Sequence, residues 1–116
     1  MLPVNQPLLD GREKELLIEC IESGWISSDG PYVKKFEDGF AQFIGVKHGV
    51  AVANGTAALE AALFAIDLKE GDEVIMPSFT IISCGQAVTN LGATPVLIDS
   101  DANTWCMDVT SIESRV

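Results

Sequence analysis

Apolar residues in the first part of the chain recur at the spacing of amphipathic helices. Residues 11–23 predict a first helix, and Gly24 would end it because glycine commonly terminates helices. A second helix is predicted to run through Phe43, with Asp29 and Pro31 as its start signals. The apolar face of the second helix consists of Val33, Phe36, Phe40 and Phe43. The first helix is therefore expected to be an amphipathic surface helix, and the second to carry one apolar face.

From residue 45 the pattern changes to short apolar strands that alternate with helices. Strands are predicted at 49–53, 73–76 and 94–98, and helices at 56–67, 81–90 and 110–115, the last with Asp108 as its cap. Apolar runs such as VAVA, EVIM and PVLI are what a parallel sheet covered by helices requires. We therefore expect an α/β fold in which residues 1–44 form an amino-terminal helical segment and residues 45–116 form part of an α/β domain.

The helix predicted at 56–67 is apolar on nearly every side. Its sequence AALEAALFAI carries a charge only at Glu60. A helix that is hydrophobic all round is usually buried. We expect this helix to pack into the domain interior, against the sheet.

Charge and composition limit the classes of partner. A hydrophobic content of 47% with 21% charged residues is ordinary for a folded globular protein. Seventeen acidic residues against seven basic ones give a net charge of -10, which repels a nucleic-acid backbone. The start of the chain lacks a signal-peptide pattern, and no apolar run approaches the roughly 20 residues that span a bilayer. We expect a cytoplasmic protein that binds neither nucleic acid nor membrane.

The sequence predicts no metal site. Cys20, Cys84 and Cys106 are odd in number and widely spaced, and His48 is the single histidine. We expect free thiols in a reducing compartment. Asp99 follows a predicted strand, at the edge where open α/β sheets place their ligands, and is a possible neighbour of a site.

The junction between strand and helix at residues 50–59 is the main candidate for chemistry. Gly55 has no Cβ, so the backbone can approach a ligand closely. The N–H groups of Gly55, Thr56 and Ala57 would be free at the helix start, and the Thr56 hydroxyl adds a donor. A phosphate there would gain from the helix dipole and from charge-assisted hydrogen bonds. The same spacing also fits a simple turn in which Thr56 caps the helix.

Three motifs follow one another in a fixed order. They are NGTAAL at 54–59, GDEVIMPSFT at 71–80, and GATPV at 92–96 followed by Asp99. With Pro3-Val4, the GWISS loop at 24–28 and Phe36-Glu37, these motifs resemble the DegT/DnrJ/EryC1/StrS sugar aminotransferase family, in particular its perosamine-synthase-like members. The likeness covers essentially the whole chain and corresponds to the amino-terminal portion of the family.

This resemblance implies the amino-terminal part of the large domain of a fold-type I enzyme that uses pyridoxal 5'-phosphate (PLP), with a mostly parallel sheet flanked by helices. It implies that Gly55, Thr56 and Ala57 bind the PLP phosphate. The family's aromatic residue that stacks on the pyridine ring falls here on Ile81, which is a departure. Ile81 could pack on the ring face, and Phe79 is the nearest aromatic substitute.

The resemblance also implies a function, an aminotransferase that converts a keto nucleotide sugar to an amino sugar for polysaccharides such as O-antigen. Glutamate would be the amino donor and the full-length protein a homodimer. The family's Schiff-base lysine comes from a motif beyond residue 116, so we assign no catalytic residue and expect the isolated chain to be an inactive portion. A PLP- or PMP-dependent sugar dehydratase of the same family, or a non-catalytic phosphate-binding module, remains an alternative.

Overall fold

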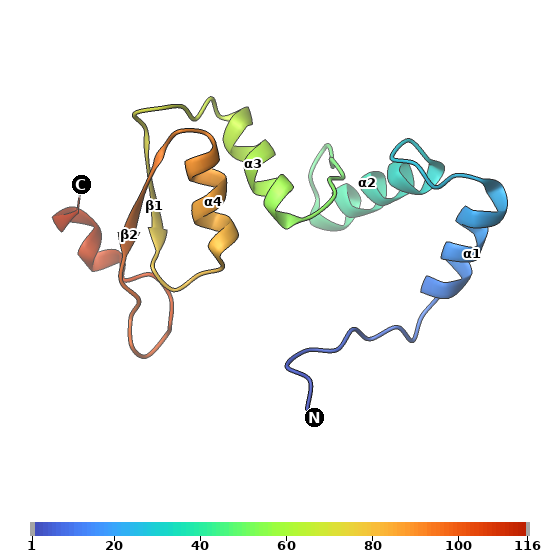
Figure 1. Ribbon diagram of the computed structural model, residues 1–116, viewed down its shortest axis with the longest axis horizontal. Helices are drawn as coiled ribbons and strands as arrows, with labels where there is room; N and C mark the ends of the chain where they lie inside the picture. The colour runs from blue at the N-terminus through green and yellow to red at the C-terminus, as the bar shows by residue number, and fades with distance from the viewer. Residues whose placement is uncertain (1, 116) are drawn as a thin grey trace. The chain divides into compact units, whose positions relative to one another are not determined.

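The computed structural model describes residues 2–115 and divides the chain into two compact units between Ala51 and Val52. The first unit is helical, and the second contains the sheet (Figure 1). The predicted domain boundary at residues 44 and 45 stays a prediction, because a compact unit is defined by contacts and not by independent folding.

The first unit contains helices α1 (Glu13–Ser23) and α2 (Pro31–Ile44), close to the predicted ranges. Gly24 ends α1 in the left-handed conformation with a φ of 75°, as glycine without a Cβ readily does. The predicted capping role of Asp29 is wrong. Gly30 is the N-cap of α2 and no side chain caps this helix, since Asp29 lies one position too early.

The segment that follows α2 folds back onto that helix. The backbone N–H of Ala51 donates to Oε1 of Glu37 at 2.9 Å. A Cβ placed on Gly49 would lie 2.6 Å from the carbonyl oxygen of Glu37, closer than side-chain atoms come. The predicted strand at 49–53 is wrong, because these residues pair with no strand within residues 2–115 and the Ala51 N–H is satisfied by a carboxylate.

The second unit is an α/β arrangement built around two parallel strands. Its elements are α3 (Gly55–Ala65), β1 (Glu73–Pro77), α4 (Ile82–Asn90), β2 (Thr94–Ile98) and the 3-10 helix η1 (Val109–Ser114). The strands pair in register from Glu73 opposite Thr94 to Pro77 opposite Ile98, and α4 crosses between them (Figure 1). The predicted parallel pairing and the range of β2 are confirmed.

The core of the second unit lies where α4 packs against the two strands. Ala87 and Val88 of α4 are buried, and Ile98 at the end of β2 is 1% exposed. Exposure alternates along β1, as is typical of a sheet covered on one face, whereas β2 is buried mainly at its end. Helix α4 therefore contacts both strands of the pair.

Helix α3 packs less deeply than its composition predicts. None of its residues is buried, and Phe64 is 74% exposed. Within the described residues, α3 packs mainly against α4. The prediction of a buried helix is wrong for these residues, because α4 covers only one side of α3.

Candidate functional site

The amino terminus of α3 is capped by Asn54. Asn54 has an extended backbone, and its Oδ1 accepts a hydrogen bond from the N–H of Ala57 at 2.9 Å. Asparagine is among the residues most favoured at this position. The alternative in which Thr56 caps the helix is wrong, and so is the expectation that the Ala57 N–H is free.

Two backbone donors at this helix start remain available. Within residues 2–115, the backbone N–H groups of Gly55 and Thr56 donate to no protein acceptor. A Cβ added to Gly55 would meet nothing within 4 Å, so the side of Gly55 where a side chain would lie is open. The first turn of α3 carries no acidic residue. The chemistry of this end of the helix therefore fits an anion.

The Thr56 side chain connects α3 to α4. Its Oγ1 donates to Oγ of Ser83 at 3.0 Å, and both residues are partly buried. Farther along the two helices, Nδ2 of Asn90 donates to Oε1 of Glu60 at 2.6 Å. These two bonds hold α3 and α4 side by side with their amino termini at the same end.

The two candidate ring-contact residues lie in the segment between β1 and α4. Ile81 is the N-cap of α4 and is 68% exposed. It lines an apolar cavity of about 330 Å³ together with Met76 and Leu97. Phe79 lines a different cavity, so the structure does not bring Phe79 and Ile81 together.

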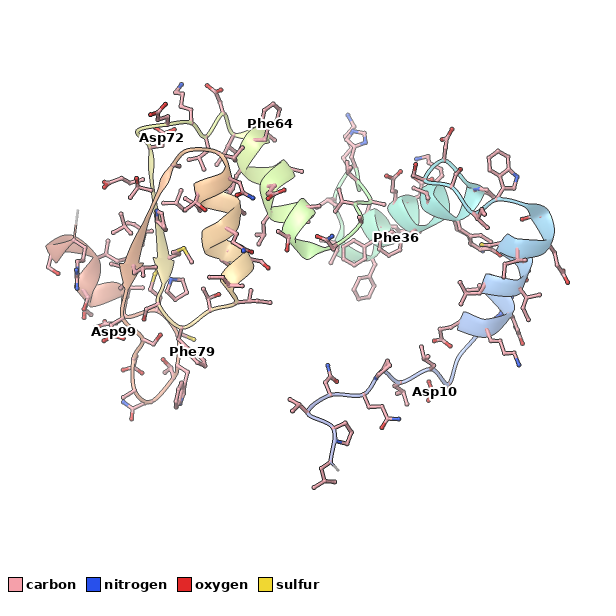
Figure 2. The ribbon with its side chains drawn as sticks, viewed as in Figure 1. Asp10, Phe36, Phe64, Asp72, Phe79 and Asp99 are labelled. Atoms are coloured by element: carbon pink, nitrogen blue, oxygen red, sulfur yellow. The ribbon has the colours of Figure 1, made fainter. Side chains whose placement is uncertain are left out.

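Phe79 packs against Trp105 at the carboxyl end of the sheet. Their ring centroids are 5.3 Å apart and the rings are tilted by 59°. The cavity that they line, about 430 Å³, also contains Asp99, whose Oδ1 accepts from the N–H of Ser100 at 2.8 Å. Figure 2 shows Phe79 and Asp99 at the same end of the sheet. Asp99 therefore lies at the carboxyl edge of the sheet, as predicted, and lines the same cavity as Phe79.

The loop beyond Asp99 is fixed by two further carboxylates. Hydrogen bonds from the backbone and side chain of Thr104 lower the pKa of Asp101. The Thr110 hydroxyl, followed by the Ser111 hydroxyl, lowers the pKa of Asp108, which caps η1 as predicted. Both carboxylates are occupied by hydrogen bonds within the loop, so their role is to fix its shape.

Reasoning from sequence missed the capping role of Asn54, and it missed Ser83 as the partner of Thr56. Asn54 had a usable signal, because asparagine directly before a helix is a preferred cap. Ser83 had none. It meets Thr56 only in the folded chain, across 27 positions of sequence.

The described residues offer neither a metal site nor a membrane-spanning helix. No group of three His, Cys, Asp or Glu side chains within residues 2–115 is placed to hold a metal ion. Among the helices of the same stretch, none combines the length and apolarity needed to cross a membrane. The three cysteines are free thiols.

Comparison with known proteins gives consistent matches. Residues 7–116 match the DegT/DnrJ/EryC1/StrS aminotransferase family. The chain is 49% identical over 115 residues to GDP-perosamine synthase of Escherichia coli O157:H7, covering 99% of this chain and 32% of that protein. It thus spans about a third of the length of the curated relatives that it matches.

Solved structures share the fold closely. The PLP form of Spr1654 from Streptococcus pneumoniae, assigned as a sugar aminotransferase, matches with a TM-score of 0.90 and 32% identity, over 99% of this chain and 29% of that one. GDP-4-keto-6-deoxy-D-mannose-3-dehydratase of E. coli, with bound hydrated PLP, matches with a TM-score of 0.87 and 28% identity, over 98% and 31%. The fold of this chain therefore also occurs in proteins whose structures contain PLP.

Proposed function

Since the chain belongs to the DegT/DnrJ/EryC1/StrS aminotransferase family, we propose that the protein containing it is a PLP-dependent aminotransferase of sugar biosynthesis. The expected match to the amino-terminal portion of this family is confirmed, as is the fold class, part of a fold-type I domain. PLP is the expected cofactor.

The amino terminus of α3 is the observation that supports the cofactor assignment. The N–H groups of Gly55 and Thr56 have no protein acceptor within residues 2–115, the position of a Cβ on Gly55 is open, and the first turn carries no carboxylate that would repel an anion. Bound PLP would supply the electron sink for moving an amino group. The chain would hold its phosphate at Gly55 and Thr56, with Ala57 supporting the site through its bond to Asn54.

Ile81 and Phe79 are proposed to contact the ring end of the cofactor. Ile81 is the better placed, because it is the N-cap of α4 and α4 is tied to the phosphate end by the Thr56–Ser83 bond. Phe79 is engaged with Trp105 in the neighbouring cavity. An aliphatic contact at Ile81 would exclude water from one face of the ring without aromatic stacking.

The proposed substrate is a keto nucleotide sugar, with glutamate as the amino donor. The support is the similarity to GDP-perosamine synthases from three bacteria, at 40% to 49% identity. A homodimer, a role in polysaccharide or O-antigen synthesis and a cytoplasmic location remain predictions. They concern the whole protein, and this chain covers about a third of such relatives.

A second candidate is a sugar dehydratase that also uses PLP. The likeness to the E. coli dehydratase supports it, at a TM-score of 0.87. The identity of 28% is lower than the 49% shared with a perosamine synthase, so the aminotransferase fits better.

The test uses the full-length protein that contains this chain. It would be incubated with PLP, glutamate and GDP-4-keto-6-deoxy-D-mannose, and the sugar product would be identified by mass spectrometry. A sugar whose keto oxygen has been replaced by an amino group supports the aminotransferase, and a keto sugar that has lost one hydroxyl oxygen without gaining nitrogen supports the dehydratase. PLP binding without any conversion would favour the non-catalytic module, and no PLP binding at all would refute the proposal.

A further inference from the structure

Ser83 is a polar residue that the proposed cofactor site does not yet use. It lies in the first turn of α4, is partly buried, and accepts a hydrogen bond from Oγ1 of Thr56 at 3.0 Å. Thr56 lies in the first turn of α3. A serine from another helix therefore contacts the residue proposed to bind the phosphate.

The hydrogen bond between Thr56 and Ser83 leaves one hydroxyl proton free to donate. Two hydroxyl groups carry two protons, and their mutual hydrogen bond uses one of them. With Thr56 as the donor, the proton of Ser83 remains, and it meets no acceptor among residues 2–115. The pair therefore presents one hydroxyl donor, carried by Ser83.

The start of α4 also lacks a cap. Its N-cap is Ile81, which has no side-chain acceptor, and no side chain caps this end. Within the described part of the chain, the backbone N–H groups of Ile82 and Ser83 have no protein acceptor. The first turn carries no acidic residue. Unpaired amides at an uncapped helix end favour a negatively charged partner.

We infer that Ser83 is a phosphate-binding residue, so that the PLP phosphate is held jointly from α3 and α4. This inference rests on the proposed function and adds a residue to its site. Thr56 donates to Ser83, and Ser83 donates to a phosphate oxygen. Thr56 then acts partly through Ser83, and the two hydroxyls form one unit.

The experiment measures PLP binding to the apo form of the full-length protein by absorbance. In Ser83→Ala, the loss of one hydrogen bond to a charged group should weaken PLP binding about tenfold or more. Binding of pyridoxal, which lacks the phosphate, should stay within about twofold because no charge-assisted bond is lost. Ser83→Thr should restore most of the PLP affinity because it keeps the hydroxyl.

Thr89→Val is the matched control, because it removes a hydroxyl from the same helix that donates to the backbone of Gln86. It should leave PLP affinity unchanged. Combining Thr56→Val with Ser83→Ala should cost little more than the larger single change, since the two hydroxyls act together.

The outcomes distinguish failure of the Ser83 assignment from failure of the proposed PLP-dependent function. If the unaltered protein binds no PLP, the proposed function fails. If it binds PLP and Ser83→Ala binds it equally well, the inference alone is wrong. Equal weakening for PLP and pyridoxal would also overturn it, because that result indicates a general structural role for Ser83.

Discussion

Oδ1 of Asn54 accepts a hydrogen bond from the backbone N–H of Ala57, at 2.9 Å, directly beside two amides that have no protein acceptor. The cap is uncharged. It stabilises the helix start and adds no negative charge to the place proposed for a phosphate. A capping residue needs a side-chain oxygen, which aspartate would also supply, whereas a neighbouring phosphate requires that position 54 carry no negative charge. Asparagine provides the oxygen without the charge.

Substitutions at Asn54 should separate these two roles. Asn54→Asp keeps a capping oxygen, so stability should change little, but its charge should weaken PLP binding at least severalfold. Asn54→Ala should lower the free energy of unfolding by about 1 kcal/mol through loss of the cap. Thermal unfolding and PLP titration of the full-length protein would check both. Unchanged PLP affinity in Asn54→Asp would argue against a phosphate at this helix end.

Ile98 should be a major contributor to stability. It is 1% exposed where β2 packs under α4. Ile98→Ala should cost about 2–5 kcal/mol, because it leaves a cavity, whereas Ile98→Val should cost about 0.5–1.5 kcal/mol. Chemical denaturation of both variants tests this order. Equal costs for the two would contradict the tight packing described for this position.

Two glycines should respond in opposite ways to alanine. Gly92 has a φ of 79°, and an added Cβ would lie 3.4 Å from Cβ of Glu70, so Gly92→Ala should cost about 1–2 kcal/mol. Gly39 is inside α2 with open space around it, so Gly39→Ala should stabilise by about 0.5–1 kcal/mol. Melting temperatures of the pair would show the difference. A rise in both would mean that Gly92 is not constrained.

Asp108 should make stability depend on pH. Hydrogen bonds from Thr110 and Ser111 lower its pKa in the folded chain. Its contribution is therefore present above the ordinary aspartate pKa of about 3.9 and is lost as the pH falls through the lowered folded value. Asp108→Asn keeps a capping oxygen without the charge, so it should melt earlier than the unaltered protein at neutral pH. The gap should close in strong acid, and a gap of constant size would refute this assignment.

Local signals explain how much of the fold the sequence predicts. β2 occupies the predicted range, and α4 begins within one residue of it, because an apolar run and its flanking turn residues are close neighbours in the chain. The strand predicted at 49–53 failed for the opposite reason. A strand is defined by a partner, and the VAVA pattern carries no information about whether one is adjacent.

In the candidate site, too, local patterns could be predicted from the sequence and contacts between distant segments could not. Gly55 and Thr56 could be proposed from the sequence because a glycine before an apolar helix is a local pattern. The pairing of Phe79 with Trp105 and the bond between Thr56 and Ser83 join distant segments. No spacing rule predicts such pairs, so the polar network around the helix ends required the folded structure.

The contact between Gly49 and the Glu37 carbonyl limits how this region can be re-engineered. The obstacle is the backbone of α2 itself, which cannot rotate away as a side chain could. Position 49 is therefore closed even to a methyl group. Anyone who transplants α2 into another scaffold with its following loop must keep that glycine, or separate the loop from the helix and lose the Glu37–Ala51 hydrogen bond with it.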